Sequence, residues 1–320
     1  MELKKIVVAG GGVLGSQIAF QVAYCGFDVT IWARSEDSKK RVETKLDGLT
    51  KTYISAIEEM AKDKAKWCDG ISDVKRFNKE KCLKNVEKIS EKLKIETDLG
   101  KALKGADLVI EAISELKKEK LAFYKKIAGM MDKKTILATN SSTLLPSSFA
   151  KATGRPEKYL AIHFANSIWK NNTAEVMIHE GTKEKYFDAV VQFAKDIRMY
   201  PLPIAKEKSG YLLNSMLVPF LLSGLDLYAN GISDPESIDK AWTRGTGAPN
   251  GPFEIMDVVG LTTAYNIVEQ YQKVPGLINP LLKKMMMPYN FKKMKEVLKK
   301  YIDEGKLGKQ AGEGFYKYKK

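Results

Sequence analysis

The sequence predicts an α/β protein whose sheet is mostly parallel and doubly wound, followed by a second, all-α C-terminal domain. Up to about residue 200, apolar strand segments alternate with amphipathic helices, which is typical of a parallel sheet covered by helices on both faces. Beyond that point nearly everything has helical spacing, with glycine and proline between the helices. We place the domain boundary near residue 204, which gives domains 1–204 and 205–320.

The first predicted element is an apolar strand that runs directly into Gly10-Gly11-Gly12-Val13-Leu14-Gly15 and then into a helix. This G-x-G-x-x-G arrangement is typical of a Rossmann-type dinucleotide site. Gly10 allows a tight turn, Gly12 lets backbone N–H groups approach a pyrophosphate, and Gly15 lets the helix pack closely on its strand.

The phosphates of such a cofactor would lie at the helix N-terminus, at Val13 and Leu14, where unpaired N–H donors favour negative charge. A second strand over 28–32 follows at the spacing that this kind of site requires. The strand makes the dinucleotide interpretation much stronger than the glycines alone.

The remaining elements of the first domain follow in order. We expect a charged helical hairpin over 36–96, a strand over 106–112, a helix over 117–131 and a strand over 135–138. Two further apolar runs, 159–164 and 174–178, are separated by only nine residues, too few for a crossover helix. We therefore expect these two strands to pair as neighbours outside the parallel order.

Composition and charge exclude several classes of protein. The formal net charge is +14, but the lysines are interspersed with acidic residues, so we expect small polyanionic ligands and no nucleic acid. Cys25, Cys68 and Cys82 lack the spacing of metal ligands and favour a reducing compartment, so we expect a cytoplasmic protein without a metal site. We expect no secretory leader and no membrane span, because polar residues interrupt the most apolar stretch, 210–228.

The chain has two histidines for proton transfer near neutral pH. His163 lies near the C-terminal end of its predicted strand, at the edge where open α/β sheets bind ligands, whereas His179 falls at the far end of the neighbouring strand. Glu175 comes twelve residues after His163, so a hairpin-like return would bring carboxylate and imidazole together. Such a pair suits a general base, and a structural pair is the alternative interpretation.

Two further polar positions are candidate ligand contacts. The segment 140–143 follows a predicted strand at the same edge, and after one of its hydroxyls caps the next helix a second hydroxyl is left for a ligand. Asn214 lies on an otherwise apolar helix face, where an amide is costly to bury without partners. This asparagine serves either as a structural hydrogen bond between the domains or as a ligand contact.

Taken together, these positions resemble the L-3-hydroxyacyl-CoA dehydrogenase family over essentially the whole chain. Five sequence blocks carry the resemblance, in the order of the chain. They are Thr139-Asn140-Ser141-Ser142 (S-N-T-S), His163-Phe164-Ala165-Asn166 (H-F-x-N), Gly210-Tyr211-Leu212-Leu213-Asn214 (G-F-[IV]-x-N), Gly251-Pro252-Phe253 with Asp257 (G-P-F-x-x-x-D), and Gly308-Lys309 with Gly312-Glu313-Gly314-Phe315-Tyr316 (G-K-x-x-G-x-G-F-Y).

The resemblance implies an oxidoreductase that oxidises the 3-hydroxyl of a short-chain (S)-3-hydroxyacyl-CoA with a nicotinamide cofactor. It implies that His163 is the general base and that Glu175 orients it. It also implies that Ser142 and Asn214 hydrogen-bond the substrate oxygen, and that the chain forms a homodimer through its helical domain.

The resemblance assigns Asn166 to the nicotinamide and Glu111 to the neighbourhood of the dinucleotide. The family usually ends its second strand with Asp, but this chain has Ala33, followed by Arg34 and Ser35. An acid there binds ribose hydroxyls and repels a 2′-phosphate, whereas an arginine neutralises one. We therefore expect NADP(H) to be preferred, with NAD(H) as the alternative.

Other departures leave the substrate open. Ser167 replaces the proline that follows the family's H-F-x-N, and the loop 168–173, which would border the acyl pocket, differs from the family's apolar segment. Ser215 and Gln310 replace a family arginine and lysine. One alternative is therefore a dehydrogenase of a free hydroxy acid, similar to gulonate or carnitine dehydrogenases. Another is a non-catalytic dinucleotide-binding protein similar to the crystallin-like members of the fold, which the retained polar site residues disfavour.

Overall fold

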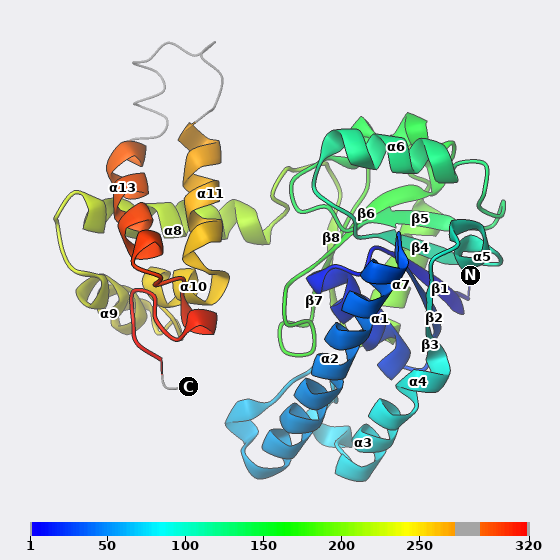
Figure 1. Cartoon of the computed structure of the whole chain (residues 1–320), viewed down its shortest axis with the longest axis horizontal. Coiled ribbons are helices and arrows are strands. Elements are labelled where there is room, and N and C mark those ends of the chain that lie inside the picture. Colours follow the sequence, from blue (N-terminus) through cyan, green and yellow to red (C-terminus); the bar gives the residue numbers. More distant parts are fainter. Residues whose placement is uncertain (1, 273–288, 319–320) are drawn as a thin grey trace. The chain divides into compact units, whose positions relative to one another are not determined.

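The computed structural model describes residues 2–272 and 289–318. The chain divides into two compact units, Met1–Leu212 and Leu213–Lys320. The first unit contains a sheet with helices on both faces, and the second is helical (Figure 1). The segment 205–212 belongs to the first unit.

The first unit is built on an eight-stranded sheet with strand order β3-β2-β1-β4-β5-β6-β7-β8. All neighbouring strands are parallel except β6 and β7, which are antiparallel. The strands are β1 (Lys5–Ala9), β2 (Asp28–Trp32), β3 (Leu93–Glu96), β4 (Leu108–Glu111), β5 (Ile136–Thr139), β6 (Tyr159–Phe164), β7 (Thr173–Met177) and β8 (Tyr200–Ile204). The predicted doubly wound class is confirmed, and so is the pairing of the two apolar runs outside the parallel order.

Helices cover both faces of this sheet, which explains why its strands are apolar at nearly every position. In β1, Ile6 and Val8 join the core on one face while Val7 and Ala9 join the core on the other, and all four are fully buried. The first face carries α1 (Val13–Tyr24), α2 (Glu36–Lys62) and α7 (Glu184–Asp196), and the second carries α5 (Leu99–Leu103) and α6 (Lys117–Ile127).

The predicted hairpin over 36–96 is present, but it ends earlier than expected. The long α2 lies beside α3 (Lys79–Glu87), which is followed by the short α4 (Ile89–Lys92) (Figure 1). Residues 93–96 are not helical and form the edge strand β3. The expectation fails there because a segment of four residues is too short to show the period of a strand beside a long helical region.

The stretch expected as an extended connector at Pro201 and Pro203 is the strand β8. It is the last strand of the sheet and pairs with β7 on one side only. Two prolines in five residues argue against a strand, because proline has no N–H to donate to a neighbouring strand. At the edge of a sheet that N–H is not needed, so β8 tolerates both prolines.

The second unit packs five described helices around one apolar core. They are α8 (Leu213–Ala229), α9 (Pro235–Thr246), α10 (Pro252–Val259), α11 (Leu261–Gln272) and α13 (Phe291–Asp303). Phe253, Met294 and Leu298 are completely buried in this core. Proline is found at the first positions of α9 and α10, where its missing N–H is not needed.

Two buried aspartates hold this helical unit together. Asp239 accepts hydrogen bonds from the N–H groups of Phe253 and Glu254, and Asp257 accepts them from the N–H groups of Phe315 and Tyr316, all at 2.8 or 2.9 Å. A Cβ on Gly251 would lie 2.4 Å from Asp239, and one on Gly314 would lie 2.0 Å from Asp257. The G-P-F and G-F-Y blocks therefore join helix ends and the chain terminus to buried carboxylates.

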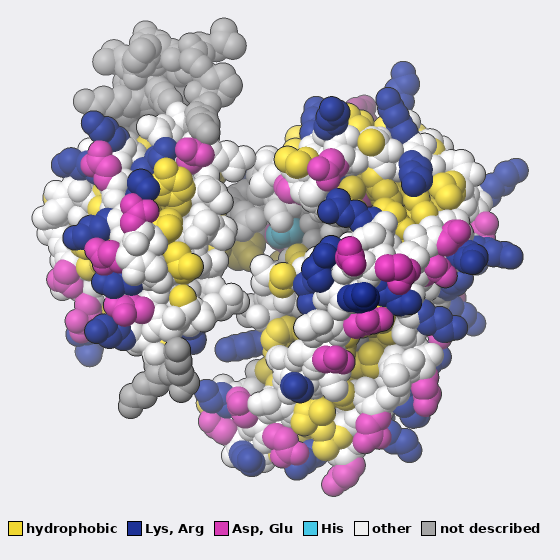
Figure 2. Space-filling model, viewed as in Figure 1, with side chains coloured by type: hydrophobic (Ala, Val, Ile, Leu, Met, Phe, Trp, Pro, Cys, Tyr) yellow, Lys and Arg dark blue, Asp and Glu magenta, His cyan; other side chains and the backbone are white. Residues whose placement is uncertain are grey.

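On the face that Figure 2 shows, lysine and arginine side chains alternate with acidic ones rather than forming a basic stripe. Among the described residues, no helix is both long and apolar enough to cross a membrane.

Candidate active site

The glycine-rich turn after β1 has the shape that a pyrophosphate requires. Gly10 has a φ of +118°, and a Cβ there would lie 2.5 Å from the carbonyl oxygen of Ala112. A Cβ on Gly15 would lie 2.0 Å from the oxygen of Gly10, so glycine alone lets α1 approach the turn. A Cβ on Gly12, in contrast, would meet no protein atom within 4 Å. The turn is closed on its protein side and open at Gly12, where the phosphates would pass.

The first turn of α1 faces the same way. Val13, 65% exposed, and Leu14 form this turn, and Gly12 at its start has no side chain to cap it. The first N–H groups of the helix are therefore available to an anion, and no acidic side chain lies in the first turn to compete for them. These residues fit a dinucleotide.

The residues after β2 lie at the same edge of the sheet. Ala33 is buried, and Arg34 and Ser35 are exposed. The Ser35 hydroxyl caps α2 by accepting the N–H of Ser38, and Arg41 donates to the Ser38 hydroxyl at 2.8 Å. Two arginines and two hydroxyls thus lie on the end of β2 and the first turns of α2, where the family's aspartate is missing.

His163 and Glu175 are direct partners in the antiparallel β6–β7 ladder. Nδ1 of His163 lies 2.8 Å from Oε2 of Glu175, and the two residues are only 6% and 2% exposed. Because a carboxylate accepts hydrogen bonds and cannot donate them, the neutral imidazole carries its proton on Nδ1 and its lone pair on Nε2. The other carboxylate oxygen of Glu175 accepts the N–H of Leu212 at 2.8 Å.

Ser142 lies on the lone-pair side of this imidazole. Its Oγ is 3.1 Å from Nε2 of His163, so the hydroxyl donates to the ring nitrogen. The neighbouring Ser141 accepts the N–H of Leu144 at 3.0 Å and so plays the structural role that we expected of one hydroxyl in this segment. The structure therefore brings His163 and Glu175 together as their spacing predicts, and it adds Ser142 as the family resemblance implies.

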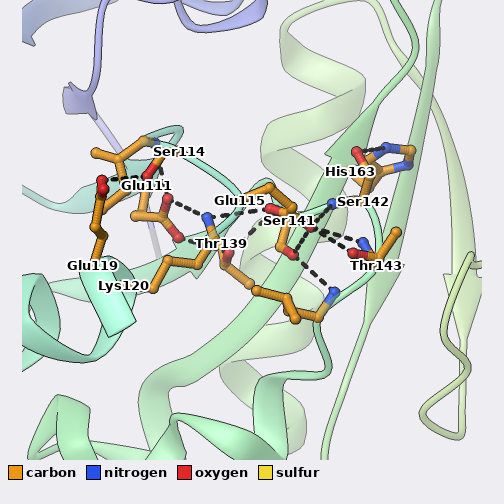
Figure 3. A network of polar contacts seen from close by, with 12 residues as sticks. Glu111, Ser114, Glu115, Glu119, Lys120, Thr139, Ser141, Ser142, Thr143 and His163 are labelled. Atoms are coloured by element: carbon orange, nitrogen blue, oxygen red, sulfur yellow. Dashed lines mark hydrogen bonds and ion pairs between the residues drawn. The ribbon is translucent and has the colours of Figure 1, made fainter. Parts of the chain in front are cut away.

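Glu115, which the sequence analysis did not single out, holds the loop that carries Ser142. Its Oε1 accepts from the Ser141 hydroxyl at 2.5 Å, from the N–H of Ser142 at 3.0 Å, and from both the N–H and the hydroxyl of Thr143 at 2.9 and 3.0 Å (Figure 3). Burial raises the pKa of Glu115, but the Ser141 hydrogen bond, the charge of Lys120 and the Thr143 donors together hold it below its usual value. The carboxylate is therefore ionised at neutral pH and fixes the loop.

Glu111 is fully buried at the end of β4, and its own partners surround it. It pairs with the buried Lys120 at 2.6 Å, and it accepts hydrogen bonds from Tyr124, from Thr139 and from the N–H of Ile113. Lys120 also lies 3.5 Å from Glu115, so the network continues to the Ser142 loop (Figure 3). Glu111 thus supports the carboxyl edge of the sheet indirectly, by fixing the side chains of Lys120, Tyr124 and Thr139.

The loop after His163 rests on α1 and on the helical hairpin. Asn166 is exposed, and its carbonyl accepts from the side chain of Asn171 at 2.8 Å. Ser167 has a φ of +59° and donates its N–H to Gln17 of α1 at 2.9 Å. Ile168 is fully buried, and the ring of Trp169 lies 5.6 Å from that of Tyr53 in α2. The loop that departs from the family pattern is thus packed against both elements.

His179 has hydrogen-bond partners of its own, outside this cluster. His179 donates from Nε2 to the carbonyl of Pro156 and accepts the N–H of Gly181 on Nδ1, both at 3.0 Å, so its tautomer is the opposite of His163's. Asn214 is half-buried in the first turn of α8, in the second unit. Across the described ranges, no group of three His, Cys, Asp or Glu side chains is arranged to hold a metal ion.

An open glycine-rich turn and a buried imidazole with one available lone pair, both at the carboxyl edge of a doubly wound sheet, define an NAD(P)-dependent dehydrogenase. The family models for the NAD binding domain and the C-terminal domain of 3-hydroxyacyl-CoA dehydrogenase match residues 5–208 and 210–318. The chain belongs to the 3-hydroxyacyl-CoA dehydrogenase family, as the sequence blocks predict.

Individual relatives agree with this assignment. The chain is 32% identical to human mitochondrial hydroxyacyl-coenzyme A dehydrogenase, over 99% of this chain and 92% of that protein. It is 29% identical to 3-hydroxybutyryl-CoA dehydrogenase of Clostridioides difficile, over 99% and 100%. Among solved structures it is similar to a diketoreductase described as acting on dicarbonyl compounds, with 43% identity, a TM-score of 0.82, and coverage of 99% and 100%.

We predict that Glu115→Gln lowers kcat by about tenfold, because a neutral amide oxygen replaces the carboxylate that accepts the donors of the Ser142 loop. The control is Glu119→Gln, which removes a nearby exposed carboxylate bonded to Ser114. Equal turnover of the two variants would contradict the prediction.

The same variant has a predicted pH signature. Since the pKa of Glu115 is lower in the folded chain than in the unfolded one, its ionised form stabilises the fold above its unfolded pKa of 4.5, and this contribution is lost as the pH falls below that value. Urea unfolding should therefore separate wild type from Glu115→Gln at pH 7, and the difference should shrink as the pH falls below 4.5 and through the lower pKa of the folded chain.

Proposed function

We propose that this protein catalyses reversible hydride transfer at the 3-hydroxyl of a short-chain (S)-3-hydroxyacyl-CoA, giving the 3-ketoacyl-CoA. The observation that carries the proposal is the 2.8 Å contact between Nδ1 of His163 and the Glu175 carboxylate, which leaves the Nε2 lone pair of the neutral ring available at the carboxyl edge of the sheet. The family names of the relatives support the thioester substrate.

Each polar side chain then has a role in the reaction. When bound, a nicotinamide cofactor would supply the hydride acceptor for C3 of the substrate. Nε2 of His163 takes the proton of the hydroxyl, and Glu175 stabilises the resulting imidazolium through Nδ1. Ser142, which touches Nε2, and Asn214 of the second unit would hydrogen-bond the substrate oxygen as charge develops on it.

The chain also has the residues to hold the cofactor. The turn Gly10–Gly15, including Val13 and Leu14, would bind the pyrophosphate, and Asn166 would lie beside the nicotinamide. Glu111 would act on the cofactor only indirectly, since four protein groups already use its carboxylate.

A second candidate function is reduction of a free dicarbonyl compound or oxidation of a free hydroxy acid. It is favoured by the similarity to the diketoreductase, which at 43% identity exceeds the similarity to the acyl-CoA enzymes. It is also favoured by the packed loop 167–173, which differs from the family's acyl-pocket segment. Proton transfer by the dyad of His163 and Glu175 is the same in both functions, and the two differ in whether the substrate must carry CoA.

We predict that the chain reduces acetoacetyl-CoA, and that free acetoacetate or an uncharged diketo ester is reduced at most about a hundredth as efficiently, a discrimination of about 3 kcal/mol. Initial rates with each substrate and each reduced cofactor measure this. Activity confined to the free dicarbonyl compounds would transfer the assignment to the second candidate, and no activity on any of them would favour the non-catalytic interpretation.

Two variants test the assignment of His163 as the general base. We expect His163→Gln to lower kcat by about two orders of magnitude or more, whereas His179→Gln, which changes a histidine bonded only to backbone groups, should leave kcat within about twofold.

We propose further that NADP(H) is preferred over NAD(H). The support is the absence of an acid at Ala33 together with Arg34, Ser35, Ser38 and Arg41, which place two positive charges and two hydroxyls around the end of β2. A 2′-phosphate carries about two negative charges, and an arginine at the end of the second strand of such a fold neutralises them. NAD(H) is the alternative, as the name of the matching domain indicates.

We predict a ratio of kcat/KM for NADPH over NADH above one in the wild type. Arg34→Ala should lower kcat/KM for NADPH by about tenfold and leave that for NADH nearly unchanged, since a charged hydrogen bond contributes about 1.5 to 3 kcal/mol. Lys62→Ala, which removes a charge from the far end of α2, is the control. A wild-type ratio below one would refute the preference.

We propose that the chain forms a homodimer through its helical unit and acts in a reducing compartment such as the cytoplasm. Met216, 67% exposed, lies four residues before Phe220 in α8, and the ring of Phe220 lies 4.5 Å from that of Trp242, which is 42% exposed. Such an exposed apolar patch favours a protein partner. The three cysteines are free thiols, which suits a reducing compartment.

Light scattering tests the dimer. We expect twice the chain mass of 35.8 kDa for the wild type and a shift toward the single mass for Met216→Asp, because a buried unpaired charge is costly at an interface. Val258→Asp, at an exposed apolar site of α10 outside this patch, is the comparison. A monomeric wild type would overturn the proposal.

A further inference from the structure

The last residues of the first unit, the connector Lys208–Leu212, follow an unusual backbone path. Gly210 has a φ of +79° and Tyr211 a φ of +54°, so two successive residues lie in the left-handed region. Glycine adopts this region freely, but a tyrosine there is strained by its Cβ. Such strain persists where the surrounding structure fixes it, and it is frequent at functional sites.

The connector contacts every part of the dyad. The ring of Tyr211 stacks on the imidazole of His163, with centroids 4.7 Å apart and planes 25° from parallel. The N–H of Leu212 donates to Glu175 Oε1 at 2.8 Å, and the hydroxyl of Ser209 donates to the carbonyl of Thr143 at 2.9 Å. A five-residue segment thus contacts the imidazole, the carboxylate and the loop that carries Ser142.

These contacts restrain motions that the dyad's own hydrogen bond does not. The N–H at Nδ1 lies in the plane of the imidazole, so its hydrogen bond to Glu175 resists movement of the ring within that plane. Tilting out of the plane is opposed by the stacked ring of Tyr211, which is itself 1% exposed and packed among Ala161, Met177 and Ile204. The strained backbone at Tyr211 is what delivers the ring to this position.

We infer that Tyr211 is a positioning residue for His163: its ring forms the wall that keeps Nε2 directed at the substrate hydroxyl, while the Leu212 N–H fixes the carboxylate. This inference rests on the proposed role of His163 as the base. The ring, not the hydroxyl, carries the effect, so phenylalanine should replace tyrosine with little loss.

The two histidines make a test that needs no substrate. In ¹⁵N-histidine-labelled protein at neutral pH, His163 should show the Nδ1–H form and His179 the Nε2–H form, so their signals are distinct. In Tyr211→Leu we expect the His163 signals to broaden or move toward a mixture of forms while those of His179 stay unchanged. In Tyr211→Phe both sets should match the wild type.

Kinetics give the second readout. Tyr211→Leu should lower kcat by between about tenfold and a hundredfold with KM for the cofactor within about twofold, and Tyr211→Phe should keep kcat within about twofold. A wild-type His163 spectrum in Tyr211→Leu overturns the inference, and so does an equal loss of kcat in Tyr211→Phe.

Folding and function can be separated in this design. If Tyr211→Leu also loses the His179 signals, the variant is misfolded, and Tyr211→Met, whose unbranched side chain fills the space without a ring, is judged by the same criteria. If the wild type has both tautomers as expected but turns over no substrate, the proposed function fails while the spectra still decide the role of Tyr211.

Discussion

The antiparallel pairing of β6 and β7 is the constraint on which the candidate site depends. In a fully parallel sheet, the start of β7 would lie at the opposite edge from the end of β6, and Glu175 would be far from His163. Because β7 runs opposite to β6, the two residues are direct partners in the ladder and both lie at the carboxyl edge of β6, the same edge of the sheet that carries the glycine-rich turn. The loops that follow β4 and β5 begin at the same edge, and they carry Glu115 and Ser142 to this pair.

A common device recurs in both units: a buried carboxylate whose oxygens are occupied by several donors. Glu175 receives an imidazole and a backbone N–H, and Glu111 receives a lysine, two hydroxyls and a backbone N–H. Asp239 and Asp257 do the same in the helical unit. An ionised group is costly to bury unless its lone pairs are occupied, and each of these carboxylates in turn fixes the backbone that supplies the donors. The two family blocks at 251–257 and 308–316 are therefore explained by packing of the helical unit.

The sequence predicted the parts of the site that depend on local spacing. The glycine turn, the strands around it and the proximity of His163 to Glu175 all follow from patterns of a few residues, since period and loop length determine them. Glu115 and Tyr211 could not be found that way, because their roles depend on the path of a loop and a connector through space. Glu111 and Glu115 are both glutamates and lie four residues apart. Only the structure shows that Glu111 is buried against Lys120 and that Glu115 holds the loop with Ser142. The prolines of β8 led to a wrong expectation for a related reason. Proline excludes an inner strand but not an edge strand, and local spacing does not show which of the two a segment will form.

That edge strand has a consequence for how the protein behaves in a crowded solution. In β8 the Tyr200 N–H and the Ile204 carbonyl bond toward the β7 side, so the intervening Pro201 and Pro203 face outward. An intruding strand from another molecule would find ring nitrogens where it needs amide donors, and could not extend the sheet there. At the opposite border, β3 is only four residues long and carries Lys94 and Glu96. A sheet of eight strands with two open borders is in this way protected from uncontrolled self-association.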